Sequence, residues 1–133
     1  MTLKKGCKQL LAEANAKIEM ITVEEAIKLH DDPNTVIVDL RDIRERQRDG
    51  FIPGALHAPR GMLEFWVDPE SPYHKEIFAS GKRFVFHCAS GARSALATAT
   101  VQDMGLEPVC HVAGGFVAWK EAGGPVEAPP PRE

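Results

Sequence analysis

Residues 83–105, RFVFHCASGARSALATATVQDMG, hold the stretch that decides the fold of this chain. The aromatic and aliphatic residues at its start predict a buried strand, and the small residues that follow predict a short loop. The remainder predicts a helix that ends at Gly105. Cys88 therefore stands where a strand ends and a helix is about to begin. In open α/β sheets, binding sites form at this carboxyl end of the strands.

The sequence on either side alternates the same two patterns. Short apolar runs predict further strands at 18–21, 36–40 and 108–112, and a brief one within 52–59. Helical patterns occupy 3–18, 23–30, 41–50 and 116–123, and prolines break the aromatic stretch 61–78 into short turns. Strands that are apolar on both faces and alternate with helices indicate an α/β fold, with a parallel sheet between layers of helices.

Length and composition limit the possible functions. The chain has 133 residues, of which 44% are hydrophobic, and a net charge of -3, which together suit one globular domain. The sequence has no basic stripe, so we do not expect a nucleic-acid partner. No apolar run is long enough to cross a membrane, and no signal peptide is evident, so we expect a cytoplasmic protein. Its three cysteines form no CxxC pair and suit reduced thiols rather than a disulfide framework.

The loop after Cys88 favours ionisation of its thiol. The four residues that follow the cysteine are small: Ala89, Ser90, Gly91 and Ala92. The backbone can therefore curl around the sulfur and point its amides inward. The start of the next helix and the charge of Arg93 add positive potential, so we predict a thiolate at neutral pH. His87 should point to the other side of the strand. The alternative is a structural cysteine, since free cysteines are commonly buried.

Three segments together resemble the rhodanese-like family. Residues 88–93, CASGAR, resemble its six-residue active-site loop. Residues 39–59, DLRDIRERQRDGFIPGALHAP, resemble its first signature, and residues 112–126, VAGGFVAWKEAGGPV, resemble its C-terminal signature. The resemblance spans residues 18–126, which leaves a helical extension, 1–17, and a flexible Pro-rich tail, 127–133.

The resemblance implies a fold, an activity and a set of site residues. The fold is a five-stranded, mostly parallel sheet with helices on both faces, here with an additional N-terminal helix. The activity is sulfur transfer: Cys88 takes sulfane sulfur from a small-molecule donor such as thiosulfate, carries it as a persulfide and passes it to a thiol or protein acceptor. No metal or organic cofactor is implied. The persulfide would be held by Ala89, Ser90, Gly91, Ala92, Arg93 and Ser94. Asp39, Arg41 and Arg60 could support the site, but the simpler interpretation is a salt bridge or turn cap for Asp39 and Arg41 and an exposed side chain for Arg60.

Two features of the loop bear on which function is expected. The residue after the cysteine is Ala89 where thiosulfate-using members often have arginine, so the chain could be a low-turnover persulfide carrier or redox sensor. The loop has Cys-x4-Arg spacing, whereas phosphatase relatives have one more residue, which argues against a phosphatase or arsenate reductase. The charged run 44–49 is expected to be a solvated helix face.

Overall fold

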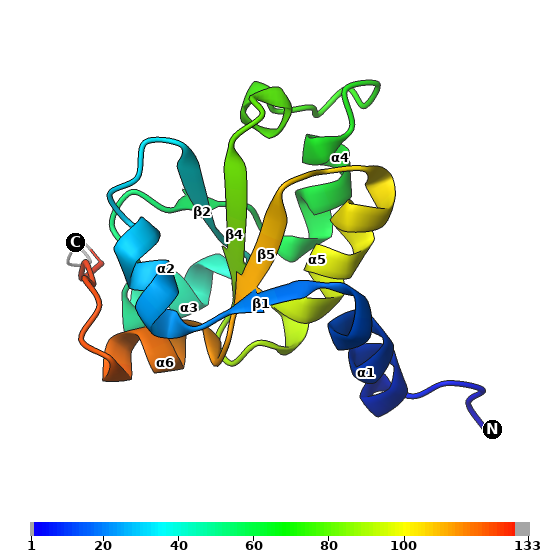
Figure 1. Ribbon diagram of the computed structural model, residues 1–133, viewed down its shortest axis with the longest axis horizontal. Coiled ribbons are helices and arrows are strands. Elements are labelled where there is room, and N and C mark those ends of the chain that lie inside the picture. The colour runs from blue at the N-terminus through cyan, green and yellow to red at the C-terminus, as the bar shows by residue number, and fades with distance from the viewer. Residues whose placement is uncertain (1, 130–133) are drawn as a thin grey trace.

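A five-stranded, all-parallel sheet lies at the centre of the computed structural model, which describes residues 2–129 (Figure 1). The strands, in spatial order, are β1 (Glu19–Ile21), β5 (Val109–Val112), β4 (Arg83–His87), β2 (Thr35–Asp39) and β3 (Leu56–His57). The last residues of β2, β3 and β4, namely Asp39, His57 and His87, lie side by side in this register. Because all strands run in one direction, the loops that follow them meet at one edge. The predicted α/β fold with a five-stranded sheet is confirmed.

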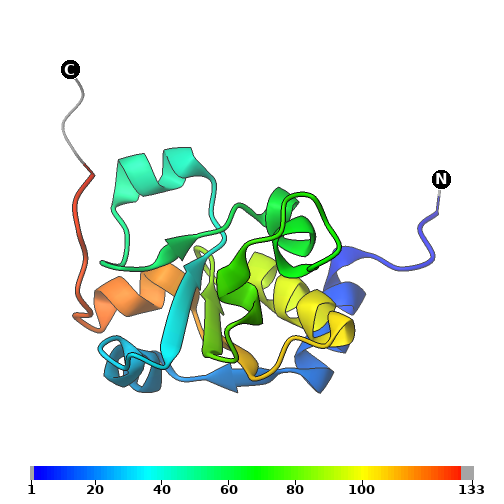
Figure 2. The same cartoon turned by 90° about the horizontal axis from the view of Figure 1, so that it is seen from above.

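Helices cover both faces of the sheet, as Figure 2 shows. One face packs against α4 (Leu63–Val67) and α5 (Ala92–Met104), and the other against α2 (Val23–Leu29) and α6 (Gly115–Glu121). Strand side chains alternate between these two layers, which explains why the strands are apolar throughout. Helix α3 (Ile43–Asp49) follows β2, and two 3-10 turns, Arg60–Met62 and Glu76–Ala79, flank the stretch around α4.

The N-terminal helix α1 (Cys7–Lys17) packs along α5. Lys17 Nζ lies 2.6 Å from Asp103 Oδ1, and the Gln102 side chain donates to the Lys17 carbonyl over 3.0 Å. The helix begins later than the predicted residue 3, because Gly6 adopts an extended conformation and Gly is a poor helix former. Within residues 2–129, no helix has both the length and the apolar character needed to cross a membrane.

Near the C-terminal end of the described residues, the chain pairs with an earlier segment in a strand-like way at Glu127. Glu127, the first residue of the predicted flexible tail, pairs with Phe51 through two backbone hydrogen bonds of 2.8 and 3.0 Å. Two residues earlier, the Pro125 carbonyl accepts from Trp119 Nε1 at 2.8 Å. The expectation of a mobile tail from residue 127 was therefore wrong for Glu127, because backbone pairing and the buried indole hold the chain there. Residues 130–133 of that predicted tail lie outside the described residues.

Candidate active site

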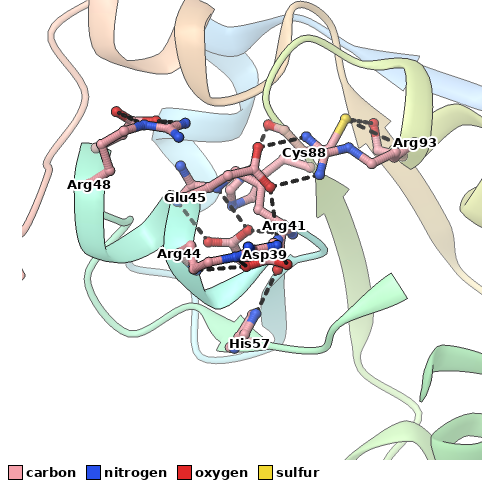
Figure 3. Close-up of polar contacts among 12 residues, drawn as sticks. Asp39, Arg41, Arg44, Glu45, Arg48, His57, Cys88 and Arg93 are labelled. Atoms are coloured by element: carbon pink, nitrogen blue, oxygen red, sulfur yellow. Dashed lines mark hydrogen bonds and ion pairs between the residues drawn. The ribbon is translucent and has the colours of Figure 1, made fainter. Parts of the chain in front are cut away.

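Cys88 lies at the carboxyl end of β4 with its sulfur inside the loop that follows (Figure 3). The side chain is buried, and Sγ accepts hydrogen bonds from the Gly91 amide at 3.2 Å and the Ser94 amide at 3.4 Å. The Ser94 hydroxyl oxygen lies 3.6 Å from the same sulfur. Gly91 makes the turn into α5 with a φ of 113°, a left-handed conformation that glycine adopts without strain. The loop is thus a cradle of N–H and O–H donors around one sulfur atom.

The donors of this cradle lower the pKa of the Cys88 thiol. Burial alone would raise it, because a desolvated thiolate is costly. The Ser94 hydroxyl and the amides of Ser94, Gly91 and Ser90 more than offset that effect, so the pKa lies below its ordinary value. The thiolate therefore persists to lower pH than in an ordinary cysteine, as the sequence predicted from the small-residue loop.

Helix α6 fixes the opposite side of the loop. The Phe116 amide donates to the Cys88 carbonyl at 2.8 Å, and the Val117 amide donates to the Ala89 carbonyl at 3.1 Å. With the carbonyls turned toward α6, the following amides turn toward the sulfur. This contact requires Gly115, since a Cβ there would lie 2.6 Å from the Cys88 carbonyl oxygen and 2.7 Å from that of Ala89. The sequence motif showed the paired glycines but not this close approach.

We expect Gly115→Ala to destabilise the protein and to slow alkylation of Cys88. The backbone at Gly115 has a φ of +58°, and the new methyl group would push the loop carbonyls away. Together these effects should lower the free energy of unfolding by at least about 2 kcal/mol. Denaturant unfolding and iodoacetamide kinetics measure the two outcomes.

Gly54→Ala is the matched control for this variant. Gly54 also has a positive φ, +78°, but apart from its chain neighbours no atom lies within 4 Å of the place that a Cβ would occupy. Gly54→Ala should therefore lower the free energy of unfolding only by the cost of the backbone strain, and it should leave the alkylation rate of Cys88 unchanged. Equal effects of the two substitutions would contradict the role given to the close approach.

Arg93 does not offer the sulfur a free charge. Its guanidinium forms two hydrogen bonds with Glu45 of α3, at 2.8 and 2.9 Å (Figure 3). Glu45 also accepts from the Asp42 amide at 2.9 Å as part of a capping box, and the ion pair with Arg93 lowers its pKa. The expectation of a solvated face for 44–49 was therefore wrong at Glu45. The capping pattern at Glu45 was visible in the sequence, but Arg93, the second partner of Glu45, lies 48 residues away and could not be read from that pattern.

Asp39 and Arg41 form a buried ion pair beneath the loop. Arg41 donates to Asp39 from Nε at 3.0 Å and from Nη2 at 2.9 Å, and it also donates to the Gly50 carbonyl at 2.8 Å. Arg46 adds a contact of 3.3 Å to Asp39. Burial opposes ionisation of Asp39, but the side-chain hydrogen bonds of Arg41 foremost, together with the nearby His87 and the amide and charge of Arg41, keep its pKa below the usual value. The Arg41 guanidinium lies 4.1 Å above the Phe116 ring, so the pair joins β2 to the helix that holds the Cys88 carbonyl.

The other singled-out residues lie around this centre. Arg60 pairs with Glu64 at 2.7 Å, and among residues 2–129 no hydrogen bond or ion pair links it to the Cys88 loop. His87 stacks on Phe116 on the α6 side, away from the sulfur, as expected from strand alternation. His57, which the sequence did not single out, contacts the Arg41 carbonyl at 2.7 Å.

Beside Ala89 a hollow of about 360 Å³ opens between Arg41, Phe116 and Lys120.

Comparison with known proteins places this geometry in a family. A sulfurtransferase of Allochromatium vinosum is 32% identical over 102 residues, which cover 77% of this chain and 87% of that protein. A dual specificity phosphatase Cdc25 of Arabidopsis thaliana is 30% identical over 118 residues, covering 82% and 77%. A solved structure from Rhodopseudomonas palustris, described as a protein of unknown function and possible tyrosine phosphatase, is 57% identical with a TM-score of 0.92, covering 96% of this chain and 98% of that one.

The family model for the rhodanese-like domain matches residues 22–122, which is most of the chain and includes β2 to β5 with the whole Cys88 loop. A second solved structure agrees with it, since a thiosulfate sulfurtransferase of Pseudomonas aeruginosa has a TM-score of 0.70 and 26% identity over 85% of this chain and 20% of that one. The chain belongs to the rhodanese-like domain family.

Proposed function

We propose that this protein is a sulfurtransferase that carries sulfane sulfur on Cys88. The observation that carries the proposal is the convergence of the Gly91 and Ser94 amides on one buried sulfur in a short Cys-x4-Arg loop. Such a cradle stabilises a negative sulfur, which is what both the nucleophile and a persulfide require. The sulfurtransferase names among the relatives support the same activity.

The proposed reaction has two steps. The Cys88 thiolate attacks the outer sulfur of thiosulfate, a new S–S bond forms, and the old S–S bond breaks with its electron pair leaving on sulfite. The terminal sulfur of the Cys88 persulfide is then attacked by an acceptor such as cyanide or a thiolate, and the Cys88 thiolate departs. The negative charge moves from Cys88 Sγ to the outer sulfur of the persulfide in the first step and returns to Sγ in the second, and the N–H donors of the loop stabilise it at this one place.

A phosphatase is the main competing reaction, because two relatives carry phosphatase names. Against it stands the short loop. Its amides already converge on Cys88 Sγ itself, whereas a phosphoryl group needs room for three further oxygens, each with donors. We therefore propose that the cradle holds one additional sulfur rather than a phosphate. Hydrolysis of an aryl phosphate that disappears in a Cys88 variant would refute this assignment.

Ala89 motivates the second candidate, a persulfide carrier or redox sensor with slow turnover. The residue lies at the rim of the hollow bounded by Arg41 and Lys120, and it offers an anionic donor no charge. A protein or thiol acceptor could use this hollow, and the unpaired thiols suit a cytoplasmic location. Under this alternative, Cys88 would be modified once and would not cycle.

Steady-state transfer of sulfur from thiosulfate to cyanide distinguishes these candidates. We expect multiple turnovers for the natural chain, with a KM for thiosulfate that falls about fivefold in Ala89→Arg, since one added charge at partial exposure contributes on the order of 1 kcal/mol. Ala89→Gln, which adds length without charge, is the control and should leave KM near its natural value. A single modification without turnover across several donors would favour the carrier.

A further inference from the structure

His111 of β5 lies against the Cys88 loop from a different strand. Its ring is 2% exposed, and Nδ1 lies 3.0 Å from the Ser94 hydroxyl oxygen. That oxygen lies 3.6 Å from Cys88 Sγ, so the three side chains form a continuous chain. Strand alternation accounts for the placement, because Cys110 and Val112 pack on the α6 side and His111 must face α5.

The Ser94 hydroxyl has one hydrogen and three acceptors in reach. Besides Cys88 Sγ and His111 Nδ1, the Gly91 carbonyl oxygen lies 3.3 Å from Oγ. If Nδ1 carries no hydrogen, it attracts the hydroxyl hydrogen at the shortest of these distances, and the sulfur loses a donor. If Nδ1 carries the hydrogen, it donates to Oγ, and the hydroxyl hydrogen turns to the negative sulfur, since hydrogen bonds to charged acceptors are the stronger ones.

The surroundings of His111 favour the second arrangement. Burial lowers the pKa of His111, with no charged group of the described residues contributing, so at neutral pH the ring is uncharged and has a single N–H. Nε2 is buried without a hydrogen-bond partner among residues 2–129. A hydrogen there would be an unpaired buried donor, whereas on Nδ1 it is paired with Ser94.

We propose that His111 is a positioning residue for the sulfur chemistry: its Nδ1–H donates to Ser94 Oγ and so directs the Ser94 hydroxyl hydrogen at the Cys88 sulfur. Its importance for turnover rests on the proposed sulfurtransferase function, but its effect on thiolate reactivity does not. The charged side chain that also faces Cys88 is Arg93, which is paired with Glu45 and makes no hydrogen bond or ion pair with His111.

The test compares the pH profile of Cys88 alkylation by iodoacetamide in two variants, read on the Cys88 peptide by mass. His111→Phe keeps a ring but removes the donor, and His111→Asn restores an N–H near the Nδ1 position. In His111→Phe the Ser94 hydroxyl is no longer held by Nδ1–H and can turn to the Gly91 carbonyl, 3.3 Å away. Below the pKa of Cys88, we therefore expect alkylation to slow about three- to tenfold, the factor that one lost hydrogen bond to the sulfur gives. His111→Asn should recover most of the rate, and the profiles should converge at high pH.

A control variant and a direct measurement of the His111 tautomer complete the test. Cys110→Ala, on the same strand but facing the other side, should leave the alkylation profile unchanged. Ring nitrogen chemical shifts of 15N-labelled histidine should report the Nδ1–H tautomer for His111. An unaltered alkylation profile in folded His111→Phe, or an Nε2–H tautomer, would overturn the inference. Altered alkylation without any sulfur uptake would instead refute the proposed function and leave the role of His111 standing.

Discussion

Cys88→Ser is expected to abolish sulfur uptake from every donor and to reduce turnover at least about a thousandfold, because removal of a covalent nucleophile leaves only binding and electrostatic contributions. The hydroxyl oxygen fits the cradle formed by the Gly91 and Ser94 amides, but it stays protonated at neutral pH and is a poor nucleophile toward sulfur. Intact mass after incubation with each donor measures the adduct, and the thiosulfate-to-cyanide assay measures turnover.

The other two cysteines provide matched controls for this experiment. Cys7 is exposed on α1, and Cys110 is buried on β5 with its pKa raised by burial. Cys7→Ser and Cys110→Ala should each retain the added sulfur and the turnover. An adduct that survives in Cys88→Ser and vanishes in one of the other variants would place the chemistry at a different thiol.

Asp39→Ala should destabilise the protein by about 3–5 kcal/mol, because it leaves the buried Arg41 guanidinium without its carboxylate partner. Both side chains are almost fully excluded from solvent, so water cannot replace the lost contact. Denaturant unfolding monitored by circular dichroism measures the change. Since Arg41 lies over Phe116, whose amide holds the Cys88 carbonyl, alkylation of Cys88 should slow as well.

Two comparisons identify the cause of that loss. Asp49→Ala removes one partner of the exposed pair with Arg48 and should change the free energy of unfolding by no more than about 1 kcal/mol. The double variant Asp39→Ala, Arg41→Met removes both buried charges and should be more stable than Asp39→Ala alone. If the double variant were the less stable of the two, the unpaired charge would not explain the effect.

The same ion pair gives stability a defined dependence on pH. The folded-state pKa of Asp39 lies below its ordinary value, so its contribution is fully present above that ordinary value, near 4 on average for aspartate. It is lost as the pH falls through the lowered pKa of the folded state. Stability should therefore decrease in this acidic range, and less steeply in the double variant than in the natural chain.

The order of strands and helices could be predicted from the sequence because each element carries its own periodicity. The apolar runs predicted β2 and β4 to within one residue at each end, and the strand, small-residue loop and helix around Cys88 are encoded by adjacent residues. The predicted start of α1 was too early, and the pairing of Glu127 with Phe51 was not predicted. Both depend on contacts or backbone conformations that no local sequence pattern records.

By itself, the sequence determined a parallel α/β fold and a cysteine held in a tight loop at the edge of the sheet. Only the tertiary structure decided which distant groups complete that loop. Glu45 pairs with Arg93, Gly115 lies against the Cys88 carbonyl, and His111 contacts the Ser94 hydroxyl. The physical reason lies in the strand order β1-β5-β4-β2-β3, which sets β2 and β5 on either side of the cysteine strand. Local residue patterns specify each element, whereas neighbours across the sheet follow from how the whole chain buries its apolar faces.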